Sequence, residues 1–282
     1  MKNSYANNSS LKFSQMTDSV SRLYDAYLLD LDGTVLLGDS LILGAAKAIK
    51  FLKSQNKRVV FISNNSTSTA ASYAQKLTSL GVPTENDDVI NSSMVLINFL
   101  NENIPNGRLL VIGETALCND LIHNGYDITN NDSNVDAVIV SFDRGFNYQK
   151  LQHAFDAIQN GARFFATNGD KYRPLKNGGQ PDAGAIVAAI EACTGKLCEV
   201  NVGKPSRHTI DYLMSKCLDA EAECIVVGDR PETDIQMGIN SSIDTALVLS
   251  GVTKEKNIKD IEIEPTYIIE SVESLVPGDA TK

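Results

Sequence analysis

Residues 27–34 read Y-L-L-D-L-D-G-T and place two carboxylates, Asp30 and Asp32, at the end of an apolar run. A short apolar run that ends in a Gly-Thr turn predicts a buried central strand of a parallel sheet. Open α/β sheets bind their ligands at the carboxyl edge of such strands. Carboxylates this close repel each other and lose hydration, so a cation or a shared proton must compensate them. The stretch therefore predicts a divalent-metal site, or else a polar strand end where Asp32 caps the turn.

A second acidic strand end supports the metal reading. Residues 224–229 read C-I-V-V-G-D and repeat the pattern, and Asp234 follows within two turns. If the strands that end at Asp30 and Asp229 lie side by side, three or four carboxylates converge at one edge of the sheet. Oxygen donors of this kind suit Mg²⁺. The alternative is that Asp229 begins a turn and Asp234 places a charge at the start of a helix.

Two further segments carry the groups that a phosphate needs. Ser63 and Asn64 follow a predicted strand and precede a helix, where a hydroxyl, an amide and free backbone N–H groups bind phosphoryl oxygens. Lys204 lies in a stiff Gly-Lys-Pro turn. Taken alone, the first segment is a plausible helix cap and the second a surface turn. Their order relative to the two acidic strands favours an anion site.

Composition narrows the class of protein. The chain has 282 residues, of which 43% are hydrophobic and 21% charged, and its formal net charge of −10 argues against nucleic acid and anionic membranes as partners. No window approaches the roughly 18 apolar residues of a membrane span. Residues 1–22 lack the apolar core of a secretory signal. Five cysteines without a C-x-x-C pair indicate reduced thiols, so we expect a cytoplasmic protein.

Alternating strands and helices predict the α/β class, with a Rossmann-like parallel sheet core and an inserted, smaller α/β cap domain. We expect a core domain over residues 23–91 and 198–282, a cap over 92–197, and a poorly ordered N-terminal arm over 1–22. Besides the opening strand, the expected strands are 58–62, 87–91, 109–112, 135–140, 163–166, 224–228, 245–249 and 267–269, and the expected helices are 43–55, 70–80, 94–100, 116–123, 148–159, 183–193 and 210–217.

Taken in order, D-L-D-G-T (30–34), S-N-N (63–65), G-K-P (203–205) and G-D-R-P-E-T-D (228–234) resemble the four motifs of the haloacid dehalogenase superfamily phosphatases. The segments D-R-G-F-N-Y (143–148) and T-N-G-D (167–170) are similar to the cap of the NagD-like branch, which includes AraL-type sugar phosphatases and 4-nitrophenyl phosphatases. The resemblance covers about residues 24–276. The chain departs from many relatives at residues 181–184 (P-D-A-G) and at Tyr172, both in the cap, so the departures concern the substrate and not the chemistry.

The resemblance implies a Mg²⁺-dependent phosphatase that hydrolyses small phosphomonoesters, sugar phosphates in the first place, with broad tolerance. It assigns Asp30 as the nucleophile that forms an aspartyl-phosphate and Asp32 as the general acid and then base. The remaining roles fall on the other motifs: Ser63, Asn64 and Lys204 hold the phosphate, and Asp30, the carbonyl of Asp32 and Asp229 bind the metal with Asp234 in support.

The loop after Thr34 is too short to cover a site, so the cap is expected to set specificity. Candidate substrate contacts there are Asp143, Arg144, Asn168, Asp170, Tyr172 and Arg173. The expected partner is a small phosphorylated metabolite, and a homodimer stays open because relatives of this kind often pair through the cap. Phosphoglycolate or nucleotide monophosphate hydrolysis stays open as well. A phospho-accepting regulatory module would also use an acidic strand edge, but it has no need of an acid-base at Asp32.

Overall fold

The computed structural model describes residues 16–175, 178–216, 218 and 221–277. The chain forms two compact units. The core unit comprises Met1–Ser63, Tyr73–Val89 and Leu213–Lys282, and the insert unit comprises Asn64–Ser72 and Ile90–Tyr212. The α/β class with a parallel-sheet core is confirmed, whereas the domain boundaries drawn from the sequence stay a prediction.

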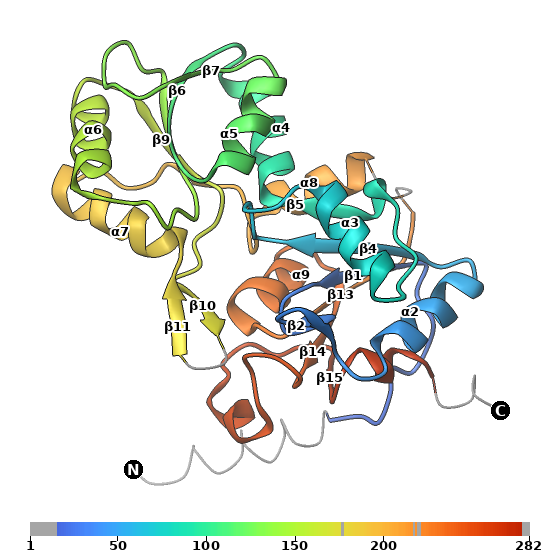
Figure 1. Ribbon diagram of the computed structural model, residues 1–282. Coiled ribbons are helices and arrows are strands. Elements are labelled where there is room, and N and C mark those ends of the chain that lie inside the picture. The colour runs from blue at the N-terminus through green and yellow to red at the C-terminus, as the bar shows by residue number, and fades with distance from the viewer. Residues whose placement is uncertain (1–15, 176–177, 217, 219–220, 278–282) are drawn as a thin grey trace, which may run out of the picture. The chain divides into compact units, whose positions relative to one another are not determined.

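The core unit is built on a six-stranded sheet with β1 near its centre (Figure 1). The residues of β1 before Asp30 are at most 1% exposed, as expected of a strand buried on both faces. β1 pairs in parallel with β13 on one side and with β4 on the other. The sheet order is β15 (Tyr267–Ile269), β14 (Asp244–Val248), β13 (Cys224–Gly228), β1 (Ala26–Asp30), β4 (Arg58–Ser63) and β5 (Val89–Asn91).

Helices follow the strands in the order that the apolar periodicity predicts. The helix expected over residues 43–55 is α2 (Ala45–Ser54), which buries Ala45, Ala48, Ile49 and Leu52 along one face. The other helical segments with residues in the core unit are α3 (Ala70–Ser79), η1 (Asn86–Asp88), α8 (Arg207–Lys216), the π-helical η2 (Pro231–Ile235), α9 (Gln236–Asn240), η3 (Glu255–Asp260) and η4 (Val272–Leu275). A small hairpin of β2 (Leu36–Leu37) and β3 (Ser40–Leu41) was not predicted, because two-residue strands carry no readable period.

The insert unit has a sheet and a core of its own. The strands of its five-stranded sheet pair in parallel, in the order β12 (Val200–Asn201), β9 (Arg163–Ala166), β8 (Ala137–Val140), β6 (Arg108–Ile112) and β7 (Asp127–Thr129). Its helices are α4 (Ser92–Asn103), α5 (Thr115–His123), α6 (Tyr148–Gln159) and α7 (Ala183–Thr194), and β10 (Tyr172–Leu175) and β11 (Gly178–Pro181) form an antiparallel hairpin. Apolar residues of β8, α6 and α7 pack into one buried cluster, so the expected separate core is present.

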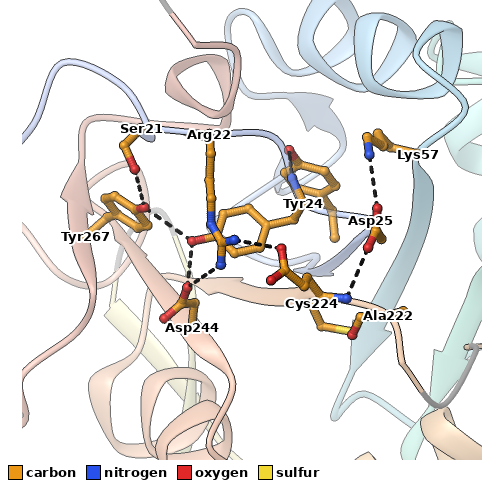
Figure 2. A network of polar contacts seen from close by, with 11 residues as sticks. Ser21, Arg22, Tyr24, Asp25, Lys57, Ala222, Cys224, Asp244 and Tyr267 are labelled. Carbon is orange, nitrogen blue, oxygen red and sulfur yellow. Dashed lines mark hydrogen bonds and ion pairs between the residues drawn. The ribbon is translucent and has the colours of Figure 1, made fainter.

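The segment that leads into β1 is attached to the core sheet from Met16 onward. Met16 bridges Ile268 of β15, and the N–H of Val20 donates to the Ser274 carbonyl at 3.0 Å. Figure 2 shows how Arg22 and Tyr24 continue this attachment: the guanidinium pairs with Glu223, and both side chains bond the carboxylate of Asp244. The first 15 residues of the expected arm lie outside the described residues.

The described cysteines form no disulfides, and the reduced state that the sequence indicates stays a prediction. Cys118, Cys193, Cys198 and Cys224 are free, and the Cys217 side chain lies outside the described part. Burial raises the pKa of the Cys198 thiol to about 12, which keeps it protonated and unreactive at neutral pH. Among the described helices, none combines the length and the apolar character needed to cross a membrane.

Candidate active site and family

Asp30 and Asp229 lie at the same edge of the core sheet, because Asp30 ends β1 and Asp229 follows the neighbouring strand β13. Leu29 of β1 lies opposite Val227 of β13, so Asp30 and Asp229 leave the sheet side by side. Asp30, Asp229 and Asp234 each offer a carboxylate oxygen, and these atoms lie within 4.8 Å of one another. Asp229 is 0% exposed and Asp234 1% exposed, whereas Asp30 is partly exposed. The convergence expected if the two strands are adjacent is therefore present, with three carboxylates.

A glycine and a π turn bring Asp234 into this group. Asp234 lies in η2, where its N–H donates to the Arg230 carbonyl at 3.0 Å and its Oδ2 accepts from the Arg230 N–H at 3.1 Å. A Cβ at Gly228 would lie 2.2 Å from the Asp234 Cβ. The Gly-Asp sequence at the end of β13 is thus required, because only glycine allows this approach.

A loop that the sequence analysis missed closes around Asp229. A Cβ at Gly251 would lie 1.9 Å from Asp229 Oδ2, and one at Gly33 would lie 2.2 Å from the same atom. The Val252 N–H donates to Asp229 Oδ2, and the Ser250 hydroxyl donates to the Gly33 carbonyl at 2.8 Å. The available signal was the Ser-Gly pair that follows β14 after a single residue. This loop fixes the orientation of the Asp229 carboxylate.

The turn after β1 is held by its own backbone. The N–H groups of Val35 and Leu36 donate to the Leu31 carbonyl at 3.0 and 2.8 Å, and Gly33 donates to the Leu36 carbonyl at 2.7 Å. This compact turn contains Asp32, which is partly exposed and whose carboxylate is not among the three that converge. Any metal contact from this residue would therefore come from its backbone carbonyl, as the motif implies.

The donor set fits a divalent metal. Two carboxylates that are almost fully buried lie beside a third, and a divalent cation is a group that compensates charge of one sign held away from water. Each group is a hard oxygen donor of the type that Mg²⁺ and Ca²⁺ prefer. The glycines at 33, 228 and 251 keep side chains out of the space around these oxygens.

Two of the three phosphate-binding candidates, Asn64 and Lys204, bond each other through the Asn64 amide. Ser63, at the end of β4, is 4% exposed. Within the insert unit, Asn64 Oδ1 accepts from the backbone N–H of Lys204 at 2.8 Å, and its Nδ2 donates to the Lys204 carbonyl at 3.2 Å and to Asp170 Oδ2 at 3.1 Å. Lys204 is 3% exposed. The Asn168 amide donates to the Asn64 carbonyl at 3.1 Å. Asn64, Asn168, Asp170 and Lys204 are thus brought together.

The other cap candidates have partners of their own. Asp143 accepts from Lys150 and from the backbone N–H of Gly145. Arg144 makes a two-pronged ion pair with Glu114, at 2.6 and 2.7 Å, and this guanidinium holds the pKa of Glu114 below its usual range. Asp143 and Arg144 thus hold the loop between β8 and α6.

The hairpin of β10 and β11 carries the last two candidates. Tyr172 is 50% exposed, and Arg173 follows it in β10. Residues 176–177, between the two strands in the sequence, lie outside the described residues. Tyr172 is the aromatic residue among the six cap candidates, and its half-exposed ring is suited to apolar contact with a substrate.

Comparison with known proteins agrees with the motifs. Residues 27–127 match the haloacid dehalogenase-like hydrolase family, and residues 201–275 match the HAD-hydrolase-like family. An acid sugar phosphatase of Staphylococcus saprophyticus is 35% identical, covering 90% of this chain and 97% of its own length. Two Bacillus subtilis proteins are similarly related: the 5'-nucleotidase YutF at 34% (91% and 99% covered) and the sugar-phosphatase AraL at 33% (88% and 90%).

Solved structures show the same relationship. The p-nitrophenyl phosphatase from Archaeoglobus fulgidus superposes with a TM-score of 0.84 at 28% identity, covering 90% of this chain and 98% of that one. NagD from Escherichia coli superposes with a TM-score of 0.80 at 30% identity, covering 89% and 98%. The chain therefore belongs to the haloacid dehalogenase-like hydrolases, and its relatives include sugar phosphatases, a nucleotidase, NagD and nitrophenyl phosphatases.

Proposed function

We propose that this chain is a Mg²⁺-dependent phosphatase of small phosphomonoesters that works through an aspartyl-phosphate on Asp30. The observation that supports it most is the convergence of Asp30, Asp229 and Asp234 where the D-L-D-G-T motif leaves the sheet. Taken as a whole residue, Asp30 is less buried than Asp229 and Asp234, which supports its role as the carboxylate that meets the substrate.

In this proposal Asp30, the carbonyl of Asp32 and Asp229 hold the Mg²⁺, and Asp234 supports it. The metal, when bound, neutralises charge on the phosphate so that a carboxylate can approach a dianion. Asp229 is suited to this role because Val252 and the two glycines of neighbouring loops fix its carboxylate in one orientation.

The reaction proceeds in two displacements. A carboxylate oxygen of Asp30 attacks phosphorus, the bond from phosphorus to the leaving oxygen breaks, and the protonated carboxyl of Asp32 gives its proton to that oxygen. The Asp32 carboxylate then takes a proton from water, whose oxygen attacks the same phosphorus. The bond to Asp30 breaks, inorganic phosphate leaves, and both carboxyl groups return to their starting states.

The motifs assign the phosphate oxygens to three groups: the Ser63 hydroxyl, the segment at Asn64 and the ammonium of Lys204. Sugar phosphates are the proposed substrate class, because two of the three sequence relatives above are named sugar phosphatases. A nucleotide monophosphate is the second candidate, since YutF is named a 5'-nucleotidase. Phosphoglycolate belongs in the same substrate panel.

The test is phosphate release from 4-nitrophenyl phosphate and from a panel of sugar phosphates, nucleotide monophosphates and phosphoglycolate, with Mg²⁺. We expect many turnovers per chain, abolished by Asp30→Asn and reduced at least ~10²-fold by Lys204→Ala or Asp229→Ala. Circular dichroism of each variant checks that the fold is kept. Retention of one phosphate per chain without turnover would instead support a phospho-accepting module, and full activity of Asp30→Asn would remove that residue as nucleophile.

A further inference from the structure

The Asn64 side chain bonds the protein through both of its N–H donors and through its oxygen. An asparagine amide has two N–H donors and one carbonyl oxygen. Both donors are used, toward Asp170 Oδ2 at 3.1 Å and the Lys204 carbonyl at 3.2 Å, and the oxygen accepts from the Lys204 N–H at 2.8 Å. A phosphate would have to break one of these bonds to reach the amide.

The orientation of this amide follows from its partners. The backbone N–H of Lys204 can only donate, so the atom that faces it must be Oδ1. The Asp170 carboxylate and the Lys204 carbonyl accept, so the atom between them must be the NH₂ group. Flipping the amide would bring a donor to a donor and an oxygen to two oxygens. The three bonds therefore support one another, and Asp170 fixes Asn64 in the orientation that holds Lys204.

The surroundings leave little freedom to this cluster. The Asn64 carbonyl accepts from Ser92 Oγ at 2.8 Å and from Asn168 Nδ2 at 3.1 Å, so backbone and side chain are both held. A Cβ at Gly203 would lie 2.7 Å from Asn64 Oδ1, which requires the glycine before Lys204. Lys204 itself is 3% exposed. The backbone of this lysine is thus clamped on both its N–H and its C=O.

We infer that Asn64 is a positioning residue, whose side chain fixes the backbone of Lys204 and is itself oriented by Asp170, rather than a phosphate ligand. This inference rests on the proposed function, because it concerns how the lysine is aimed at a phosphate. Within it, Asp170 acts through Asn64 and not through the substrate, and only the backbone N–H of Asn64 remains for the phosphate role that the motif implies.

The test is a double-mutant cycle on the binding of inorganic phosphate to the Mg²⁺-loaded protein, measured by calorimetry, which needs no turnover. We expect Asn64→Ala to weaken binding about 10-fold when Lys204 is present, since misplacing a charged group by about 1 Å has large effects. In a Lys204→Met background the same change should alter the dissociation constant less than twofold. An equal loss in both backgrounds would mean that the amide contacts phosphate directly, and would overturn the inference.

A second pair of variants keeps the test decisive if Asn64→Ala does not fold. Asn64→Asp places a carboxylate oxygen against Asp170 Oδ2 and the Lys204 carbonyl, so phosphate binding and kcat for 4-nitrophenyl phosphate should both fall. Adding Asp170→Asn restores a donor–acceptor pair between the two side chains. In this double variant we expect recovery of at least half of the change in the logarithm of the phosphate dissociation constant. No recovery would contradict the inference that Asp170 orients Asn64. If the unmodified protein neither binds phosphate nor turns over 4-nitrophenyl phosphate, the proposed function has failed instead.

Discussion

Gly251 provides the sharpest test of the acidic site, because it touches Asp229 without taking part in chemistry. An alanine Cβ at this position would lie 1.9 Å from Asp229 Oδ2 and 2.7 Å from its Cβ. The oxygen must recede by about 1.5 Å to reach an ordinary contact of 3.4 Å. Asp229 is short and 0% exposed, so rotation of its side chain alone does not relieve a contact that also includes its Cβ.

The expected loss of stability and activity in Gly251→Ala follows from this contact. Gly251 does not have a positive φ, so alanine is compatible with its backbone, and overpacking of this kind costs about 1–3 kcal/mol of stability. A displacement of about 1 Å in a catalytic group lowers activity by ~10²-fold, which corresponds to ~2.7 kcal/mol in the activation free energy. We therefore expect Gly251→Ala to lose at least this factor in kcat/KM and to need more Mg²⁺ for half-maximal activity.

The matched control is Gly38→Ala in the β2–β3 hairpin. Gly38 has a φ of +63°, and a Cβ there meets nothing within 4 Å, so its cost is backbone strain of about 1–2 kcal/mol without any contact. Stability falls by a similar amount in both variants, but activity should fall only in Gly251→Ala. The assay is 4-nitrophenyl phosphate hydrolysis against Mg²⁺ concentration, beside urea unfolding. Normal activity and normal Mg²⁺ dependence in Gly251→Ala would refute the reasoning that Asp229 must be held in place.

Three further predictions concern the metal, the insert and the core network. Removing divalent metal with EDTA should abolish turnover and lower the melting temperature, and Mg²⁺ should restore both, because a bound cation stabilises only the folded state; activity that survives complete chelation contradicts this. Burial, with a smaller effect of the Asp170 charge, raises the pKa of Asp182 from 3.8 to about 6. The folded protein therefore holds this proton more tightly than the unfolded chain does. The stability that the protonated carboxyl contributes is complete below pH 4 and is lost as the pH rises through 6. The variant Asp182→Asn keeps an oxygen for the Ala183 N–H but cannot ionise. In urea unfolding, its free energy of unfolding should match that of the unmodified protein near pH 4 and exceed it by up to about 3 kcal/mol at pH 7.5. A difference in unfolding free energy that does not depend on pH would be evidence against this. Tyr24→Phe removes hydroxyl bonds to Asp244 and Tyr267 (Figure 2) and should cost ~1–2 kcal/mol in unfolding while turnover stays unchanged, whereas a loss of activity would count against a purely structural role.

Much of the fold can be predicted from sequence because many of its strands are continuous apolar runs and many of its helices have apolar residues at helical spacing. The strands at residues 163–166, 224–228 and 267–269 and the helix at 148–159 lie where their apolar patterns predict. The two hairpins and the short strands β7 and β12 were missed, because none of them contains more than two apolar residues in a row, and several include proline or glycine. The π turn that carries Asp234 was not foreseen either, because the sequence shows only that a carboxylate follows β13 within two turns.

By itself, the sequence determined which residue types stand at the strand ends: two carboxylates in one strand-and-turn segment, another after a second buried strand, and a lysine between glycine and proline. Only the tertiary structure decided that β1 and β13 are neighbours, that the loop at Gly251 closes on Asp229, and that the Asn64 amide bonds Asp170 and Lys204. The physical reason is that periodicity and turn chemistry act over a few residues. Contacts between groups 140 residues apart, such as Asn64 and Lys204, depend on strand order and close packing, which no local pattern records.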